Sequence, residues 1–298
     1  MTTKPIEEKI EILSVDLLNQ NRLQVVALKQ LAKSLGLEFG WHYLLDLTWV
    51  LSHLGSIQGK RIMDAGAGTG VMQWYLADRG ADVLSVDRLN RSNLALRFRN
   101  RFKVEGLRLN DLAPAGKVFR NNFREGISLT NVISRQTRDI VGMASIRRSS
   151  GKVTIYNQDL KNLVDIPDNS LDAVVAISAL EHNQPEDLEL VVNELLRIFK
   201  PGAPLLATLT AGYPQDWWHM PSSGWCYTDT SLMRLFQLPM DTPSNYARFN
   251  DLLAEIIDCT ELRDGLARFY YQTGDNGMPW GRWEPQYPPV GVCKIKPA

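Results

Sequence analysis

The chain has 298 residues, of which 44% are apolar and 22% charged, and its 33 basic and 33 acidic side chains give a formal net charge of zero. These values are ordinary for a globular protein, and no apolar run approaches the roughly 20 residues of a membrane span. The three cysteines are scattered without the spacing of a disulfide framework or a zinc site. Together with a charged N-terminus that lacks a signal-peptide core, this composition predicts a cytoplasmic protein.

Residues 1–55 are expected to form a helical cap. Apolar side chains recur there at helical spacing: Ile10, Leu13, Leu17 and Leu18, then Leu23, Val26, Leu28 and Leu31. Gly36 and Gly40 interrupt the pattern, and the aromatic run 41–51 predicts a further helix. Tyr43 in this run is a candidate substrate contact, with plain core packing as the alternative.

Residues 60–88 read as an apolar strand, a glycine-rich turn, a helix and a second apolar strand that ends on an acid. Gly66, Gly68 and Gly70 allow the backbone to bend sharply and to approach a ligand closely. The helix after the turn would direct its free N–H groups at that ligand. The segment therefore predicts a site for an adenosine-containing cofactor.

The residues around the turn indicate which cofactor. A dinucleotide fingerprint needs glycine or alanine where this chain has Val71. Asp64 precedes the glycines, and a carboxylate there would repel a pyrophosphate but suits the ammonium group of S-adenosylmethionine. Asp87, at the tip of the second strand, can accept ribose hydroxyls from either cofactor. A dinucleotide oxidoreductase is the alternative, which titration with a nicotinamide cofactor would test.

A basic stretch follows, with 15 Lys or Arg against 4 Asp or Glu between Arg88 and Lys152. We interpret residues 91–150 as an insertion between the second and third strands. Residues 94–104 alternate basic and apolar side chains and suit either a strand or a helix, and residues 145–156 suggest a hairpin. The charge suggests an anionic substrate, an anionic membrane surface at which the protein is peripheral, or nucleic acid. The alternative is a solvated face or a subunit contact, so an oligomer is left open.

Four segments in order resemble the class I S-adenosylmethionine-dependent methyltransferases. The run 62–70 resembles their first motif, and 156–160 resembles the end of their third strand, where an acid lies near the adenine. Residues 170–182 resemble their fourth strand with the Leu-Glu-His turn of small-molecule enzymes, and 196–209 resemble the helix, turn and fifth strand. The resemblance implies a methyltransferase domain over 56–298, with a doubly wound, seven-stranded, mostly parallel Rossmann-like sheet. It implies these cofactor-binding residues: Asp64, Ala65, Gly66, Gly68, Asp87, Arg88, Asp159, Leu160 and Ser178.

After the fifth strand, residues 211–235 form an aromatic-rich loop. Loops at the carboxyl ends of the strands line the site in this fold, so Trp217, Trp218 and Trp225 are candidate substrate contacts. A packed lid without ligand contacts is the alternative. The alternating run 287–296 predicts the antiparallel strand at the edge of the sheet.

We expect methyl transfer to a small polar acceptor, by O-methylation of a sugar or glycolipid-type substrate. A sugar hydroxyl needs a general base, for which His182 is the first candidate and His219 the second. A helix-starting or adenosine-packing role is the alternative for His182.

Glu181 and His182 alone make a weak metal motif, so no metal is expected. An RNA or protein methyltransferase that uses the insertion is a further alternative, although nucleic acid is disfavoured because the turn after strand four lacks an Asn/Asp-Pro-Pro-aromatic sequence. The last alternative is a non-catalytic binding subunit.

Overall fold

The computed structural model describes residues 7–118, 149–266 and 282–297. The strands are β1 (Lys9–Ile12), β2 (Arg61–Ala65), β3 (Asp82–Asp87), β4 (Lys103–Gly106), β5 (Lys152–Asn157), β6 (Ala173–Ile177), β7 (Pro204–Ala211), β8 (Trp217–His219), β9 (Gly224–Tyr227) and β10 (Pro289–Ile295). The helices are α1 (Asp16–Gln20), α2 (Arg22–Leu35), α3 (Tyr43–Leu54), α4 (Met72–Asp78), α5 (Leu96–Arg101), η1 (Leu180–His182), α8 (Pro185–Ile198), α9 (Asp229–Leu235), η2 (Tyr246–Arg248), α10 (Phe249–Ile257) and α11 (Thr260–Asp264).

One mixed sheet organises the molecule, with its main path in the order β1-β10-β7-β6-β2-β3-β5-β4. The strands from β7 to β4 run parallel, whereas β10 is antiparallel to both β7 and β1. The α/β class and the mostly parallel Rossmann-like sheet are thus confirmed. The expected number of seven strands is too low, because the described residues alone contribute ten strands to the sheet. Several of the additional strands have only three or four residues, which is too short to show a clear hydrophobic period.

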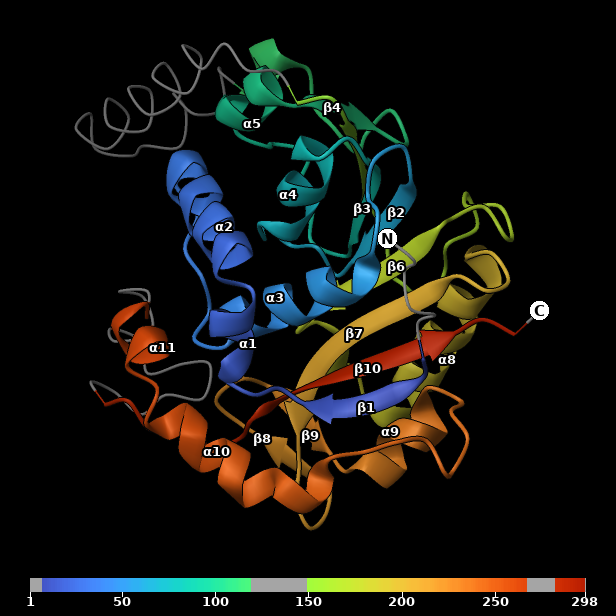
Figure 1. The fold of residues 1–298 in the computed structure, drawn as a ribbon. Coiled ribbons are helices and arrows are strands. Elements are labelled where there is room, and N and C mark those ends of the chain that lie inside the picture. The colour runs from blue at the N-terminus through green and yellow to red at the C-terminus, as the bar shows by residue number, and fades with distance from the viewer. Residues whose placement is uncertain (1–6, 119–148, 267–281, 298) are drawn as a thin grey trace.

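Two hydrophobic cores lie on the two faces of the sheet (Figure 1). Successive residues of a strand point to opposite faces, so Ile62 joins the core under α3 and α4, whereas Met63 joins the core under α8 and α9. The central strands are buried on both faces and therefore read as continuous apolar runs. This three-layer arrangement leaves the carboxyl ends of the parallel strands as the place for a ligand.

The N-terminal segment contributes to both the helical layer and the sheet. Residues 16–20, 22–35 and 43–54 are the helices α1 to α3, but residues 9–12 form strand β1 against β10. Placing Ile10 on a helix face was therefore wrong. The run Lys-Ile-Glu-Ile has the period of two that is typical of a strand, and Ile10 and Ile12 are buried in the core under α8.

In the basic stretch, residues 96–101 are helical and residues 103–106 form strand β4. The helix places Phe98 and Phe102 against Trp74, with ring centroids 4.6 and 5.0 Å apart. Neither alternative holds over all of residues 94–104, because the helix ends at Arg101 and a strand begins at Lys103. Most of the expected hairpin over 145–156 belongs either to β5 or to residues outside the described part of the chain.

The C-terminal strand β10 pairs antiparallel with β7, as the alternating run predicts. It does not form the edge of the sheet, because β1 covers its other side (Figure 1). Within residues 7–118, 149–266 and 282–297, no helix has the length and apolar character needed to cross a membrane.

Candidate functional site

Two cavities open along the carboxyl ends of β2, β3, β5 and β6. The larger, about 630 Å³, is lined by the glycine turn 66–70, the loop 36–40, Tyr43 and Asp64. The second, about 280 Å³, is lined by the following residues: Asp87, Arg88, Asp159, Leu160, Ala179, His182 and Asn183. Gly66 and Ser178 line both, so the two cavities adjoin, and we refer to them together as the groove.

The groove collects nearly all of the residues expected to bind a cofactor. Asp64, Gly66 and Gly68 line its larger part, and Asp87, Arg88, Asp159 and Leu160 line its smaller part. Ala65 lines neither cavity, because its side chain is fully buried in the core on the α8 face.

Hydrogen bonds connect the glycine turn to the end of β3. The N–H groups of Gly66 and Ala67 both donate to the carbonyl of Val86, at 2.9 and 3.0 Å, and the Gly68 N–H donates to Asp87 Oδ2 at 2.7 Å. Gly66 has φ +73°, and a Cβ there would lie 2.4 Å from the Cβ of Ala179. The first glycine is thus required both by its φ angle and by the close approach of the segment after β6.

Asp64 lies at the end of β2 with only 2% of its surface exposed. Its Oδ2 has no hydrogen-bond partner among the described residues. Burial is the largest influence on this carboxyl and, with the nearby Asp87 carboxylate, raises its pKa to about 7, although Arg91 acts in the opposite direction. A buried acceptor without a partner is costly unless a ligand supplies a donor, and the ammonium group of an amino acid fits this position.

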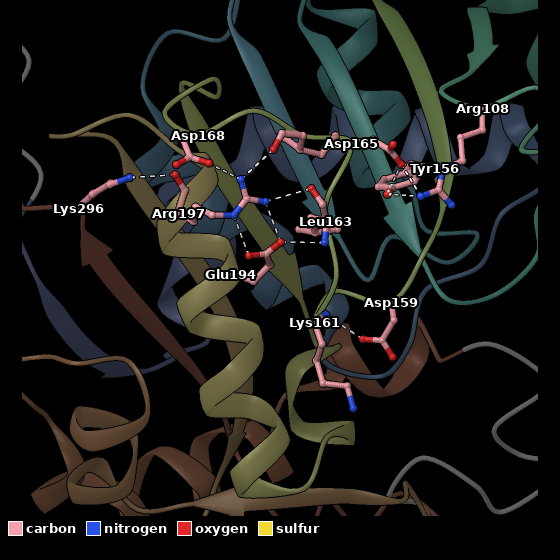
Figure 2. A network of polar contacts seen from close by, with 11 residues as sticks. Arg108, Tyr156, Asp159, Lys161, Leu163, Asp165, Asp168, Glu194, Arg197 and Lys296 are labelled. Atoms are coloured by element: carbon pink, nitrogen blue, oxygen red, sulfur yellow. Dashed lines mark hydrogen bonds and ion pairs between the residues drawn. The ribbon is translucent and has the colours of Figure 1, made fainter.

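Two further acids line the smaller cavity of the groove. Asp87 accepts the N–H of Gly68 through Oδ2 and that of Leu89 through Oδ1, the latter at 2.7 Å, so its carboxylate is held in a fixed orientation. Asp159 accepts the Lys161 N–H at 2.8 Å, as Figure 2 shows. Both acids keep lone pairs that ribose hydroxyls or an adenine amino group could use.

Three buried polar residues behind the turn were missed from the sequence. Gln73 Nε2 lies 3.4, 3.4 and 3.1 Å from the carbonyls of Ala67, Gly68 and Gly70, and its Oε1 accepts from Ser85 Oγ at 2.7 Å. The Arg91 guanidinium in turn donates to Ser85 Oγ. The available signal was a Gln on a buried helix and a Ser within an apolar strand, since buried polar residues must have partners.

The segment after β6 joins the two halves of the groove. Ser178 has φ +44°, and its Oγ donates to Glu181 Oε1 at 2.5 Å. Glu181 is 1% exposed, and burial raises the pKa of its carboxyl. His182 lines the smaller cavity and not the larger one.

The hydrogen bond of His182 assigns its neutral tautomer. His182 Nδ1 lies 2.9 Å from the carbonyl oxygen of Ser223. Because a carbonyl only accepts, Nδ1 carries the proton, and Nε2 of the neutral ring holds the free lone pair. The ring is therefore oriented with an accepting nitrogen available.

His219 does not fit the role of a catalytic base. It is 1% exposed, with Nδ1 at 2.6 Å from Ser222 Oγ and Nε2 at 3.1 Å from Gln286 Oε1. Burial lowers its pKa, so the neutral ring is favoured. Both ring nitrogens serve to hold the β8–β9 turn against the segment before β10, which the sequence could not reveal because Gln286 is distant in the chain.

The expected substrate aromatics do not share one surface. Trp217 stands edge-on to His219 at 5.5 Å, whereas Trp218 points the other way and meets Trp225 across the hairpin at 5.7 Å. This separation follows from the period of two along β8. Trp225 donates to Gln184 Oε1 at 3.2 Å, and Tyr43 lines the larger cavity from α3.

A buried histidine–aspartate pair, His42 and Asp46, was also missed from the sequence. His42 Nδ1 is 2.6 Å from Asp46 Oδ2, one helical turn along the start of α3, and both side chains are buried. Burial raises the pKa of Asp46, although His42 opposes the shift. Among the described residues, no group of three or more His, Cys, Asp or Glu side chains is placed to hold a metal ion.

The arginines of the basic stretch mostly bind the protein itself. Arg99 donates to the carbonyls of Leu94, Ser92 and Ala113 at 3.1, 3.0 and 2.5 Å, and Arg101 donates to Ser34 Oγ at 2.7 Å. These contacts favour a packing role over an anion-binding face for this part. The basic residues of 119–148 lie outside the described part of the chain.

The topology defines an α/β protein with a groove at the carboxyl ends of its parallel strands. A family model described as a methyltransferase domain matches residues 115–207, which run from the basic stretch into β7. The matched segment is about a third of the chain, and its similarity to a methyltransferase domain supports an S-adenosylmethionine-dependent methyltransferase. The matched range begins after the glycine turn, so the turn and the matched segment are separate lines of evidence.

Curated relatives match over a short segment. The ubiquinone biosynthesis O-methyltransferase of Acinetobacter baylyi is 44% identical over 43 residues, which are 14% of this chain and 18% of the relative. The enzyme of the same name from Bordetella avium is 40% identical over 48 residues, 16% of this chain and 20% of the relative. The matches thus span about a fifth of the length of these relatives.

Solved structures resemble the chain over most of its length. The [4+2]-cyclase SpnF covers 97% of this chain and 99% of its own, with 15% identity and a TM-score of 0.48. The geranyl diphosphate C-methyltransferase of Streptomyces coelicolor covers 86% of this chain and 77% of its own, with 14% identity and a TM-score of 0.43.

Proposed function

We propose that this protein binds S-adenosylmethionine in the groove and transfers its methyl group to the oxygen of a small polar acceptor. The observation that carries the proposal is the pairing of a buried, unpartnered carboxylate oxygen on Asp64 with the acids Asp87 and Asp159 along one groove. An ammonium group at one end and a nucleoside at the other match that order of acids.

The residues fit the cofactor as follows. Asp64 would accept from the ammonium group, the glycine turn would let the chain approach the amino-acid end, and Asp87 would accept from the ribose hydroxyls. When bound, the sulfonium supplies an already activated methyl group, so the protein contributes alignment and, for a hydroxyl acceptor, a base.

The proposed base is His182. The Ser223 carbonyl holds Nδ1 protonated and leaves Nε2 as the acceptor, which is the state that a general base requires. A high-pKa alcohol such as a sugar hydroxyl needs this help. Replacing His182 with Ala should lower turnover about 10²-fold, the lower end for a general base, with S-adenosylhomocysteine affinity changed little. An unchanged rate would remove His182 from this role.

The acceptor class rests on two observations. The curated relatives carry the name O-methyltransferase, which favours oxygen as the methylated atom. Strand β9 approaches the groove at Gly224, beside His182, although Trp217, Trp218 and Trp225 do not line either cavity. Aromatic rings at this end of the sheet suit the faces of a sugar or another ring, in keeping with a sugar or glycolipid-type acceptor. The same relatives favour an intermediate of ubiquinone biosynthesis as the second candidate acceptor.

Calorimetric titration with S-adenosylhomocysteine tests the cofactor, with a nicotinamide dinucleotide as the comparison. We expect binding of the first and none of the second, and failure to bind S-adenosylhomocysteine would overturn the proposal. A screen with labelled S-adenosylmethionine against nucleotide sugars, lipid extracts and phenols then identifies the acceptor. Cofactor binding without any methylated product in that screen would favour a non-catalytic binding subunit.

A further inference from the structure

A buried arginine lies directly behind the groove. Arg91 follows β3 and is 5% exposed, and its guanidinium reaches two neighbouring strands. Nη1 donates to Ser85 Oγ at 2.5 Å, and Nη2 donates to the carbonyls of Ser85 and Tyr156 at 2.8 and 3.2 Å. Nη1 also lies 3.4 Å from the carbonyl of Gly68 in the glycine turn. The side chain therefore links β3, β5 and the turn.

All of these hydrogen-bond acceptors are neutral. Nε has no hydrogen-bond partner in the described part of the chain, and no carboxylate there forms an ion pair with this guanidinium. A buried cation of this kind is costly unless nearby negative charge stabilises it. The carboxylates that face it are Asp64 at the end of β2, Asp87 at the end of β3 and Asp111 after β4. Two of these three acids line the groove.

We propose that Arg91 is a positioning residue for the cofactor: from behind the glycine turn, it stabilises the ionised form of Asp64 beside Asp87. This inference rests on the proposed function, because an ionised Asp64 matters only for a cationic ligand. Two carboxylates close together in a buried site disfavour one another's charged form, and a third, positive group is what permits both to be charged. Arg91 supplies that charge from the side away from the groove.

The residues that face Asp64 agree with this assignment. Its pKa is raised by burial and by Asp87 and lowered by Arg91, while Gln73 contributes a weaker lowering contact from α4. Without the guanidinium, Asp64 would hold its proton to a higher pH. A protonated Asp64 cannot pair with an ammonium group, so cofactor affinity would fall at neutral pH and return as the pH rises.

The experiment measures S-adenosylhomocysteine affinity from pH 6 to 8.5 for the wild type, Arg91→Gln and Arg91→Lys. Arg99→Gln is the matched control, because Arg99 also donates to three backbone carbonyls. Burial alone lowers the pKa of Arg99, and no carboxylate faces its guanidinium. We expect Arg91→Gln to bind about 10-fold more weakly at pH 7, to recover at pH 8.5, and to shift the pH midpoint upward. Arg91→Lys should keep a midpoint near that of the wild type.

The outcomes distinguish failure of the proposed function from failure of the role proposed for Arg91. A wild-type protein that binds no S-adenosylhomocysteine at any pH overturns the proposed function. Wild-type binding with the same pH midpoint in Arg91→Gln and Arg99→Gln overturns the role of Arg91. A pH-independent loss in Arg91→Gln would leave this arginine a purely structural residue, also against the proposal. Thermal unfolding of each variant over the same pH range identifies any protein that is not folded.

Discussion

In the proposed function, the carboxyl group of Asp64 is the group that would contact the ammonium end of the cofactor. Its pKa is raised to about 7 in the folded protein from an ordinary value near 3.8. The folded state therefore binds the proton more tightly than the unfolded chain, so the contribution of this group to stability is complete below about pH 4 and is lost as the pH rises through about 7. An ammonium ligand would pull the pKa back down.

Binding of S-adenosylhomocysteine near pH 6.5 should accordingly release roughly three-quarters of a proton. Calorimetry in buffers of different ionisation enthalpy measures this release directly. In Asp64→Asn the release should vanish and the affinity fall about 10- to 100-fold, as expected for a lost charged hydrogen bond. Asp82→Asn, at the exposed start of β3, is the control, and equal proton release in both variants would contradict the assignment.

Gly66 offers a separate test of the turn. Gly66→Ala combines a left-handed backbone, which costs about 1 kcal/mol for alanine, with a Cβ placed 2.4 Å from Ala179 Cβ. We expect a total loss of about 2 to 4 kcal/mol of unfolding free energy and weaker cofactor binding. Denaturant unfolding and calorimetry provide the two measurements.

Gly59→Ala is the matched control, because Gly59 has the same φ of +73° but open space around the added Cβ. It should lose only the backbone penalty and keep cofactor affinity. The double variant Gly66→Ala with Ala179→Gly should recover part of the loss. Equal effects of the two single variants would show that the close approach of Ala179 does not matter.

For single residues, the sequence predicts those roles that depend on local backbone geometry. Gly66, Gly68 and Asp87 belong to one strand-turn-helix-strand unit, and their roles depend on backbone geometry within that unit. The partners of Gln73, Ser85 and Arg91 are brought together by folding, and nothing in the spacing of these residues specifies them. The hydrogen bond of His219 to Gln286 was likewise not predictable, because the two residues are 67 positions apart in the chain.

Helix α8 secures the loop between β5 and β6, which carries Asp159. Figure 2 shows Arg197 of this helix at the centre of the network. It donates to both oxygens of Glu194 at 2.8 and 2.7 Å, to Asp168 at 2.5 Å, and to the carbonyls of Leu163 and Ile166 at 3.0 and 2.9 Å. The planar guanidinium with its five donors matches this set of acceptors, which a lysine ammonium cannot do.

Arg197→Lys should therefore lower the unfolding free energy by about 1 to 3 kcal/mol, because the part-buried carbonyls of Leu163 and Ile166 lose their donor. It should also weaken cofactor binding modestly, since the loop that carries Asp159 loses its attachment. Arg234→Lys is the control, because that arginine only pairs with Glu189 at the surface. Equal thermal stability of the two variants would contradict this reading of the network.

Long helices and strands were predictable from the sequence, whereas short ones were not. The long apolar strands read as continuous buried runs and α8 carries a helical period, and their types are confirmed. Residues 94–104 fitted two periods because the segment contains both a helix, which packs Phe98 on Trp74, and the start of strand β4. The β8–β9 hairpin lies within what the sequence suggested was a loop, because three- and four-residue strands leave almost no pattern.

The whole molecule is built as two cores that share one sheet. β1 from the start of the chain and β10 from its end lie side by side (Figure 1). Ile12 of β1 is fully buried in the core under α8, whereas Trp41, Trp49 and Trp74 belong to the core on the other face. Because both cores hold the same strands, loss of packing in one should weaken the other.

Ile12→Ala should therefore lower the unfolding free energy by about 2 to 4 kcal/mol through lost burial and a residual cavity. The shift should appear equally in far-ultraviolet circular dichroism and in tryptophan fluorescence, although the indoles of Trp41, Trp49 and Trp74 lie across the sheet from Ile12. Leu23→Ala on α2, where the side chain is 88% exposed, should shift neither signal by more than about 0.5 kcal/mol. A fluorescence transition that stays in place while the circular dichroism shifts would mean that the two cores unfold separately.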